Sequence, residues 1–268
     1  MKISLSGFLF ENPDGTAELT FEEFANFAVE TGYDAVQPRN SQIPLNTSET
    51  RLTRYRSLLD SLGLETSCVT FRRPPKNPRK RDRAFERSLR MAEILGADLI
   101  KLSGAPIDWI KRAAETAAER GVTLAVNNHV NTPAETLTGT LELFEKVASA
   151  NFALLFDPMH LHLGGEDEVE CLKTLYPFVR DVLVQCVREI ENGNETVVSR
   201  AGKNYAKTTI DNAPVQDWPA ILAELERRDY DGWITVIENS WPRNSRKNVA
   251  ETTLRFIKSR TTLRSANQ

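Results

Sequence analysis

The chain has 268 residues, of which 40% are hydrophobic and 26% are charged, and its formal net charge is −3 at pH 7. This composition is ordinary for a globular protein, and the small net charge gives no reason to expect binding to nucleic acid or to an acidic membrane surface. No stretch approaches the ~20 apolar residues that span a membrane, and the N-terminus makes a poor signal peptide because it soon turns acidic. The three cysteines form no CxxC pair, which predicts reduced thiols in a cytoplasmic protein.

Apolar segments of strand length alternate with helix-like segments along the whole chain. The predicted strands are Lys2–Phe10, Tyr33–Gln37, Glu65–Phe71, Asp98–Leu102, Val122–Val126, Phe152–Phe156, Val182–Val187 and Gly232–Ile237. The predicted helices are Thr20–Gly32, Thr47–Leu62, one ending at Leu95, Ile107–Arg120, one beginning at a capping box over Thr132–Glu135, Asp167–Tyr176, Asp217–Arg228 and Asn248–Lys258. No change in composition marks a linker, so residues 1–268 are predicted to form one domain.

Strict alternation of strands and helices requires parallel pairing with right-handed crossovers. The rival to a closed barrel is an open doubly wound sheet, which usually has a glycine-rich phosphate turn after its first strand. Here that turn reads SGFLFENPDG and lacks GxGxxG. The sequence therefore predicts the α/β class and a single-domain (β/α)8 TIM barrel.

The segment Arg188–Pro214 interrupts the alternation of strands and helices. It is 27 residues long, mainly polar, and contains glycines. Loops of this length inside a compact domain are usually functional lids or disordered. We expect this one to cover the mouth of the barrel, with Arg200 or Lys203 able to reach a ligand. The alternative is a loop that lies along the outer helices.

In a barrel the carboxyl ends of all strands meet on one face. The polar residues at the predicted strand ends are Gln37, Arg39, Arg72, Lys101, Ser103, Asn127, His129, Asp157, His160, Gln185, Arg188 and Glu238. Glu238 follows the apolar run WITVI, and a buried carboxylate needs a cation or hydrogen-bond partners. A salt bridge to a lysine or arginine on the same face is one explanation. Lys101 is either such a counter-charge or a cation that binds substrate.

Three motifs resemble those of the xylose isomerase-like TIM barrel superfamily, which contains the sugar phosphate isomerases and epimerases. LAVNNH resembles the family's Glu-Asn-His motif, FDPMHLHLGG its Asp-x-x-His motif, and YDGWITVIE its closing glutamate motif. The resemblance covers nearly the whole chain. It implies one divalent ion whose four ligands correspond to Asn127, Asp157, Gln185 and Glu238. Two of these match the family in type. The all-oxygen set suits Mn²⁺ or Mg²⁺ and is a poor zinc site, and both an occupied and a vacant site remain open.

The same resemblance implies an isomerase or epimerase that acts on a sugar, polyol or related hydroxy-carbonyl compound by proton transfer next to a carbonyl. Glu238 is then the expected base, with His129 and Lys101 as further catalytic groups. The expected substrate-binding residues are Gln37, Arg39, Arg72, His160, Arg188 and Lys203. A two-base epimerisation is disfavoured, because Asn127 cannot take a proton. The alternatives are a lyase or dehydratase on a keto-sugar, and a non-catalytic carbohydrate-binding barrel or partner subunit. A homo-oligomer is left open.

Overall fold

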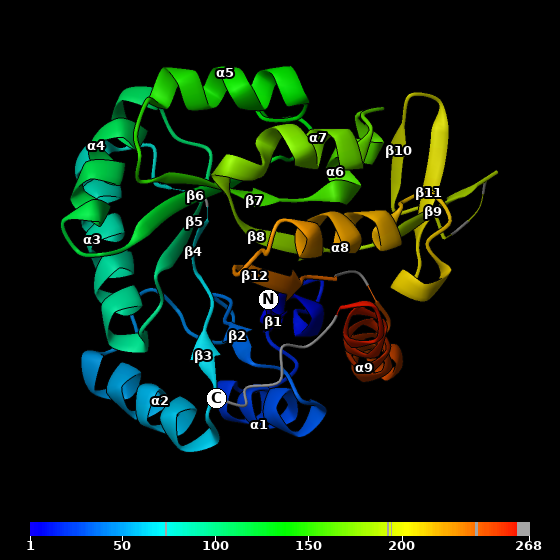
Figure 1. Cartoon of the computed structure of the whole chain (residues 1–268). Coiled ribbons are helices and arrows are strands. Elements are labelled where there is room, and N and C mark those ends of the chain that lie inside the picture. Colours follow the sequence, from blue (N-terminus) through cyan, green and yellow to red (C-terminus); the bar gives the residue numbers. More distant parts are fainter. Residues whose placement is uncertain (73, 192, 194, 239–240, 262–268) are drawn as a thin grey trace.

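The computed structural model describes residues 1–72, 74–191, 193, 195–238 and 241–261, with the side chain of residue 72 excluded. The parallel strands of this part form one nearly closed sheet in the order β3-β2-β1-β12-β8-β7-β6-β5-β4, surrounded by helices (Figure 1). Their bounds are β1 Lys2–Ser6, β2 Ala35–Gln37, β3 Glu65–Thr66, β4 Val69–Arg72, β5 Leu99–Ser103, β6 Thr123–Asn127, β7 Phe152–Phe156, β8 Val179–Val184 and β12 Trp233–Val236. The predicted TIM barrel is confirmed.

The predicted strand Glu65–Phe71 is interrupted at Ser67 and Cys68, which separate β3 from β4. β3 pairs with β2 and β4 pairs with β5, so two short strands occupy one position of the barrel. The Ser67 hydroxyl is hydrogen-bonded to the Ser4 hydroxyl at 2.7 Å. The Ser67 backbone N–H donates to the Val36 carbonyl of β2 at 3.0 Å, so the interruption stays bonded to the barrel.

The helices of the described residues lie outside the strands (Figure 1). They are α1 Phe21–Thr31, α2 Glu49–Leu62, α3 Pro78–Leu95, α4 Ile107–Ala118, α5 Leu137–Val147, α6 Pro158–Leu163, α7 Glu168–Leu175, α8 Trp218–Arg227 and α9 Arg243–Arg260. The capping box at Thr20 and Glu23 is confirmed. The one predicted over Thr132–Glu135 is wrong, because α5 is capped by the Thr136 side chain. The Thr132 hydroxyl instead donates to the carbonyl of His129 at 2.6 Å, which shapes a loop beside the site.

Two apolar clusters lie on opposite sides of the strand ring. The inner cluster fills the barrel and includes Ala35, Cys68, Leu99, Ala125, Leu155 and Leu183. The outer cluster packs the strands against the helices and includes Leu102 and Val126. Since successive side chains of a strand point to opposite faces, neighbours such as Ala125 and Val126 belong to different clusters.

The segment predicted as a long loop is a small antiparallel sheet instead. Its strands are β9 Val187–Ile190, β10 Val198–Arg200 and β11 Lys203–Lys207, in the order β10-β11-β9. Residues 192 and 194 lie outside the described part. Figure 1 shows this sheet projecting from one side of the barrel. In this sheet Arg188 pairs with Ala206, and Arg200 pairs with Lys203. This register determines which side chains face the barrel mouth.

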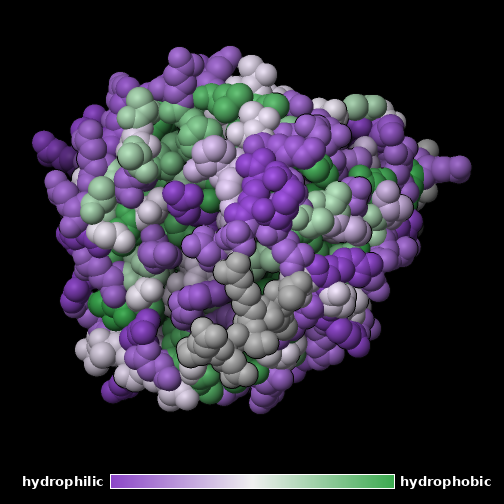
Figure 2. Space-filling model, in the orientation of Figure 1, coloured by the Kyte–Doolittle hydropathy of each residue, from purple (hydrophilic) through white to green (hydrophobic). Residues whose placement is uncertain are grey.

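The face shown in Figure 2 is mainly hydrophilic, with hydrophobic residues in small groups. Among the described residues, the large hydrophobic side chains that are exposed are Leu141 and Val197. A helix with the length and apolar character needed to cross a membrane is not found among these residues.

Candidate functional site

Asn128 fixes the loop that follows β6 to the start of the loop after β7. Its side-chain amide donates to the Asp157 carbonyl at 2.7 Å and its side-chain oxygen accepts from the Asp157 amide at 2.8 Å. Both residues are buried. The sequence analysis singled out the neighbouring Asn127 and missed Asn128. The doubled asparagine in VNNH was the available signal. Two successive side chains point to opposite sides, so only one of the two asparagines can face the cavity.

Asp157 ends β7 and immediately precedes α6, the helix that carries His160. Pro158 occupies the first helical position, where its lack of an N–H costs nothing. Among the described residues, the Asp157 carboxylate makes no capping hydrogen bond to α6. Its Oδ2 instead accepts from the Gln185 amide at 2.6 Å and lies 3.6 Å from His160 Nε2. The carboxylate is therefore directed across the barrel mouth.

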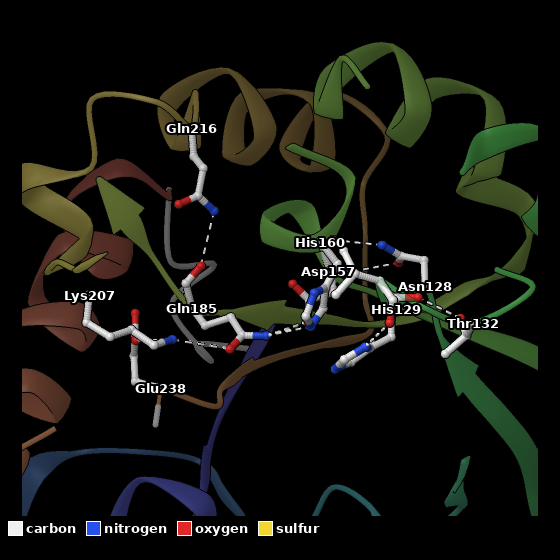
Figure 3. A network of polar contacts seen from close by, with 10 residues as sticks. Asn128, His129, Thr132, Asp157, His160, Gln185, Lys207, Gln216 and Glu238 are labelled. Carbon is white, nitrogen blue, oxygen red and sulfur yellow. Dashed lines mark hydrogen bonds and ion pairs between the residues drawn. The ribbon is translucent and has the colours of Figure 1, made fainter. Parts of the chain in front are cut away.

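A polar chain connects Asp157 to Glu238 (Figure 3). The Gln185 side-chain oxygen accepts from the Lys207 ammonium at 3.4 Å, and this ammonium lies 3.6 Å from Glu238 Oε2. The Trp241 indole donates to the same Glu238 oxygen at 3.3 Å. Glu238 is fully buried, and burial raises its pKa to about 6, partly opposed by the Lys207 charge. The sequence left open that Glu238 forms a salt bridge, and the structure gives Lys207 as its partner.

Two histidine rings lie against each other near Asp157, at one end of this series of polar contacts. The ring centroids of His129 and His160 are 3.7 Å apart. His129 Nδ1 lies 2.7 Å from the Val130 carbonyl. Because a carbonyl oxygen only accepts, this contact selects the tautomer of the neutral ring in which Nδ1 carries the proton and Nε2 the lone pair. Burial lowers the pKa of His160 to about 4, against the pull of Asp157. His160 is therefore neutral near pH 7.

Two further cations face the mouth. Burial, assisted by the charge of Arg39, lowers the pKa of Lys101 to about 8. Arg39 lies 3.5 Å from Glu11 and places its guanidinium over the Phe8 ring, 4.3 Å from the centroid. The two cations are close enough to influence each other, so this end of the mouth favours an oxygen-rich or anionic group.

These side chains surround a cavity of about 740 Å³. The predicted site residues that line it are Arg39, Lys101, Asn127, His129, Asp157, His160 and Gln185. Lys207 also lines it and was missed, because its strand belongs to the segment predicted as a loop. The sequence did indicate that this segment supplies a cation.

Other predicted site residues lie elsewhere. In the described part of the chain, Glu238 is not on the cavity wall and lies behind Lys207. Gln37 is buried and accepts from the Ser6 hydroxyl. Arg188 pairs with Glu195 and Lys203 with Glu189, both on the small sheet. The side chain of Arg72 lies outside the described residues. Arg200 pairs with Glu135 and donates to Asn131, at the loop bordering the cavity.

The donors do not fit the divalent ion that the resemblance implies. Within the described residues, no group of three or more His, Cys, Asp or Glu side chains is placed to hold a metal. The Gln185 oxygen, one of the four expected ligands, accepts from an ammonium, and its amide nitrogen donates to Asp157. An oxygen turned toward a protein cation is not available to a metal. The Lys207 ammonium thus supplies positive charge between Gln185 and Glu238.

The comparisons with known proteins agree with this architecture. The family model described as "Xylose isomerase-like TIM barrel" matches residues 25–260. The chain therefore belongs to the xylose isomerase-like TIM barrel family.

An inosose dehydratase of Bacillus thuringiensis is 29% identical over 133 residues, which are 48% of this chain and 44% of the relative. The match thus spans less than half the length of that relative. Three solved structures show the same fold. A probable 3-DHS dehydratase, AsbF of Bacillus anthracis, has a TM-score of 0.78 at 19% identity and covers 96% of this chain and 98% of its own.

The IOLI protein with a bound zinc atom has a TM-score of 0.74 at 15% identity, over 98% of this chain and 100% of its own. D-Psicose 3-epimerase of Clostridium cellulolyticum has a TM-score of 0.71 at 13% identity, over 97% and 99%. These structures share the fold, and their names include one dehydratase and one epimerase.

Proposed function

We propose that this protein removes a proton from a carbon next to the carbonyl of a sugar-like hydroxy-carbonyl compound and then expels a β-hydroxyl group as water. The observation that carries the proposal is the cavity shared by the His129 imidazole and the ammonium groups of Lys101 and Lys207. A base and fixed cations beside one space suit enolate chemistry. Aldose–ketose isomerisation, which needs the same first step, is the second candidate.

His129 is the proposed base. Its Nδ1–H is held by the Val130 carbonyl, so Nε2 is the nitrogen that accepts the proton. The electron pair of the broken C–H bond moves into the enolate. The C–O bond to the β-hydroxyl then breaks, and the imidazolium of His129 returns the proton to the departing oxygen, which leaves as water. One residue thus acts first as base and then as acid.

Lys207 stabilises the negative charge on the enolate oxygen. Gln185 and Glu238 hold its ammonium from behind, so it is already oriented before the charge develops. In this proposal Glu238 is a positioning residue, in place of the base expected from the sequence. Lys101 is the second cation facing the same cavity.

Substrate hydroxyls have partners on the wall. Asp157 Oδ1 and His160 Nδ1 are buried and lack a hydrogen-bond partner among the described residues, so each suits a hydroxyl group. Asn127 also lines the cavity and its amide cannot exchange a proton, which supports dehydration or isomerisation over a two-base epimerisation. A cytoplasmic location and a homo-oligomer stay predictions from the sequence.

The test is incubation with a panel of keto-sugars and inososes in D₂O. We expect deuterium at the carbon next to the carbonyl and a product lighter by one water. Deuterium in a product that has lost no water, and is heavier than the substrate only by the incorporated deuterium, would favour the isomerase. Binding of a panel member without any exchange would overturn the proposal and support the carbohydrate-binding barrel.

A further inference from the structure

We infer that the substrate carries an aryl or alkyl substituent, which binds in an apolar branch of the cavity between α4 and α5. This inference rests on the proposed function, because it assumes that the hydroxy-carbonyl part of the substrate lies at the barrel mouth. The apolar branch is lined by Leu102, Ala105, Ile110, Val126, Ala134 and Leu143.

The alternation of side chains along β5 and β6 places this branch outside the strand ring. Lys101 lies inside the barrel, where Asp181 and Cys68 influence its charge. Its neighbour Leu102 therefore faces outward, and it belongs to the outer cluster together with Val126, Ile110 and Leu143. Since both Lys101 and Leu102 line the same cavity, the cavity passes from the barrel mouth into the layer between strands and helices.

The chemistry of the wall changes along this path. The titratable groups that line the cavity are Arg39, Lys101, His129, Asp157, His160 and Lys207. The branch residues have hydrocarbon side chains without a hydrogen-bonding group. Sugar hydroxyls placed there would lose their hydrogen bonds to water without replacement. A hydrocarbon group would instead be removed from water at no such cost.

The size of the cavity also supports a substrate with an additional substituent. Its volume of about 740 Å³ lies within the range of roughly 300–1,000 Å³ found for pockets that hold drug-sized ligands. The cavity therefore has room for a ligand larger than a simple keto-sugar.

The experiment compares one keto-sugar with the same keto-sugar carrying a phenyl ether. We expect a KM about 10–100-fold lower for the phenyl compound, because burial of one phenyl group gives this range. Ala105→Phe fills the branch and should abolish the difference between the two compounds. Ala118→Phe is the matched control, since Ala118 is exposed at the end of α4, and it should keep the difference.

Calorimetric binding of the reduced, unreactive phenyl compound gives a readout that does not depend on catalysis. Thermal unfolding checks that Ala105→Phe is folded, and Leu143→Ala provides a second variant, which should tighten binding of a bulkier naphthyl ether. Equal affinities for the plain and phenyl compounds in the parent protein would overturn the inference. If deuterium exchange on the plain keto-sugar persists in that case, the proposed function still stands, whereas loss of exchange on every compound would overturn the proposed function itself.

Discussion

The cavity has two parts that come from the same strands and behave in opposite ways. The polar chamber consists of Lys101, His129, Asp157, Gln185 and Lys207. In the chamber, burial strengthens electrostatic interactions and moves pKa values, as at Lys101. In the apolar branch, where side chains carry no charge, burial can only favour apolar ligands. A change of one residue along β5, from Lys101 to Leu102, thus separates the polar wall of the cavity from its apolar wall.

The sharpest test of this division is His129→Asn. If the chamber alone performs the chemistry, kcat should fall about 10²–10⁴-fold, equally for substrates with and without an apolar substituent. Deuterium exchange measured by mass spectrometry checks this. His162→Asn is the control, because His162 lies 3.4 Å from Glu168 and does not line the cavity. A loss of the same size in both variants would remove His129 from its role.

Lys207→Met removes the cation held by Gln185 and Glu238. We expect kcat to fall about 10²–10³-fold, the usual cost of losing one group that stabilises an oxyanion, with little change in KM. Lys203→Met is the matched control, since Lys203 lies on β11 like Lys207 and forms an exposed pair with Glu189 of β9. Unchanged kcat in Lys207→Met would show that enolate charge is stabilised elsewhere in the chamber.

The pH dependence tests Lys101. In the proposed function Lys101 acts as a cation, in its ammonium form. Loss of its proton should therefore lower kcat/KM above a pKa of about 8, approaching tenfold per pH unit. Lys101→Arg should remove this alkaline limb, because a guanidinium stays protonated. The pH–rate profile of both proteins provides the measurement. Retention of the limb in the variant would assign it to another group.

Asn128→Ala tests the wall shared by both parts. The substitution leaves the buried amide and carbonyl of Asp157 without the two hydrogen bonds that Asn128 makes. The free energy of unfolding should fall by about 1–3 kcal/mol, as measured by urea denaturation. Asn127→Ala, one residue earlier on the cavity wall, should lose less stability. An equal loss of stability in both variants would show that the two hydrogen bonds between Asn128 and Asp157 are not the cause of the loss.

The smallest expected effect is that of metal removal. Because Lys207 supplies the cation, exhaustive treatment with EDTA should leave kcat within about twofold, and elemental analysis should find well under one Mn²⁺ or Mg²⁺ per chain. Asn127→Glu alone should not create a tight Mn²⁺ site, since Gln185 still faces Lys207. One ion per chain, with activity lost on its removal, would restore the metal centre expected from the sequence.

The barrel was predictable because alternating periodicity and caps such as Thr20 with Glu23 are local properties of the chain. The strand-end rule then selected Asp157, His129 and Lys101 as neighbours, since parallel strands end on one face. Lys207 could not be found this way. Its placement depends on an antiparallel sheet whose pairing joins residues far apart in a polar segment, and no periodicity marked those strands.

The sequence by itself determined the fold, the face that carries the cavity, and most of the polar groups on its wall. Only the tertiary structure decided how those groups are arranged, because their contacts depend on distances between elements that no local pattern contains. The Gln185 oxygen meets the Lys207 ammonium, Glu238 lies behind that ammonium, and the outward-facing Leu102 borders the same space as Lys101. Each of these contacts joins separate strands or crosses the wall of the barrel, and packing alone fixes them.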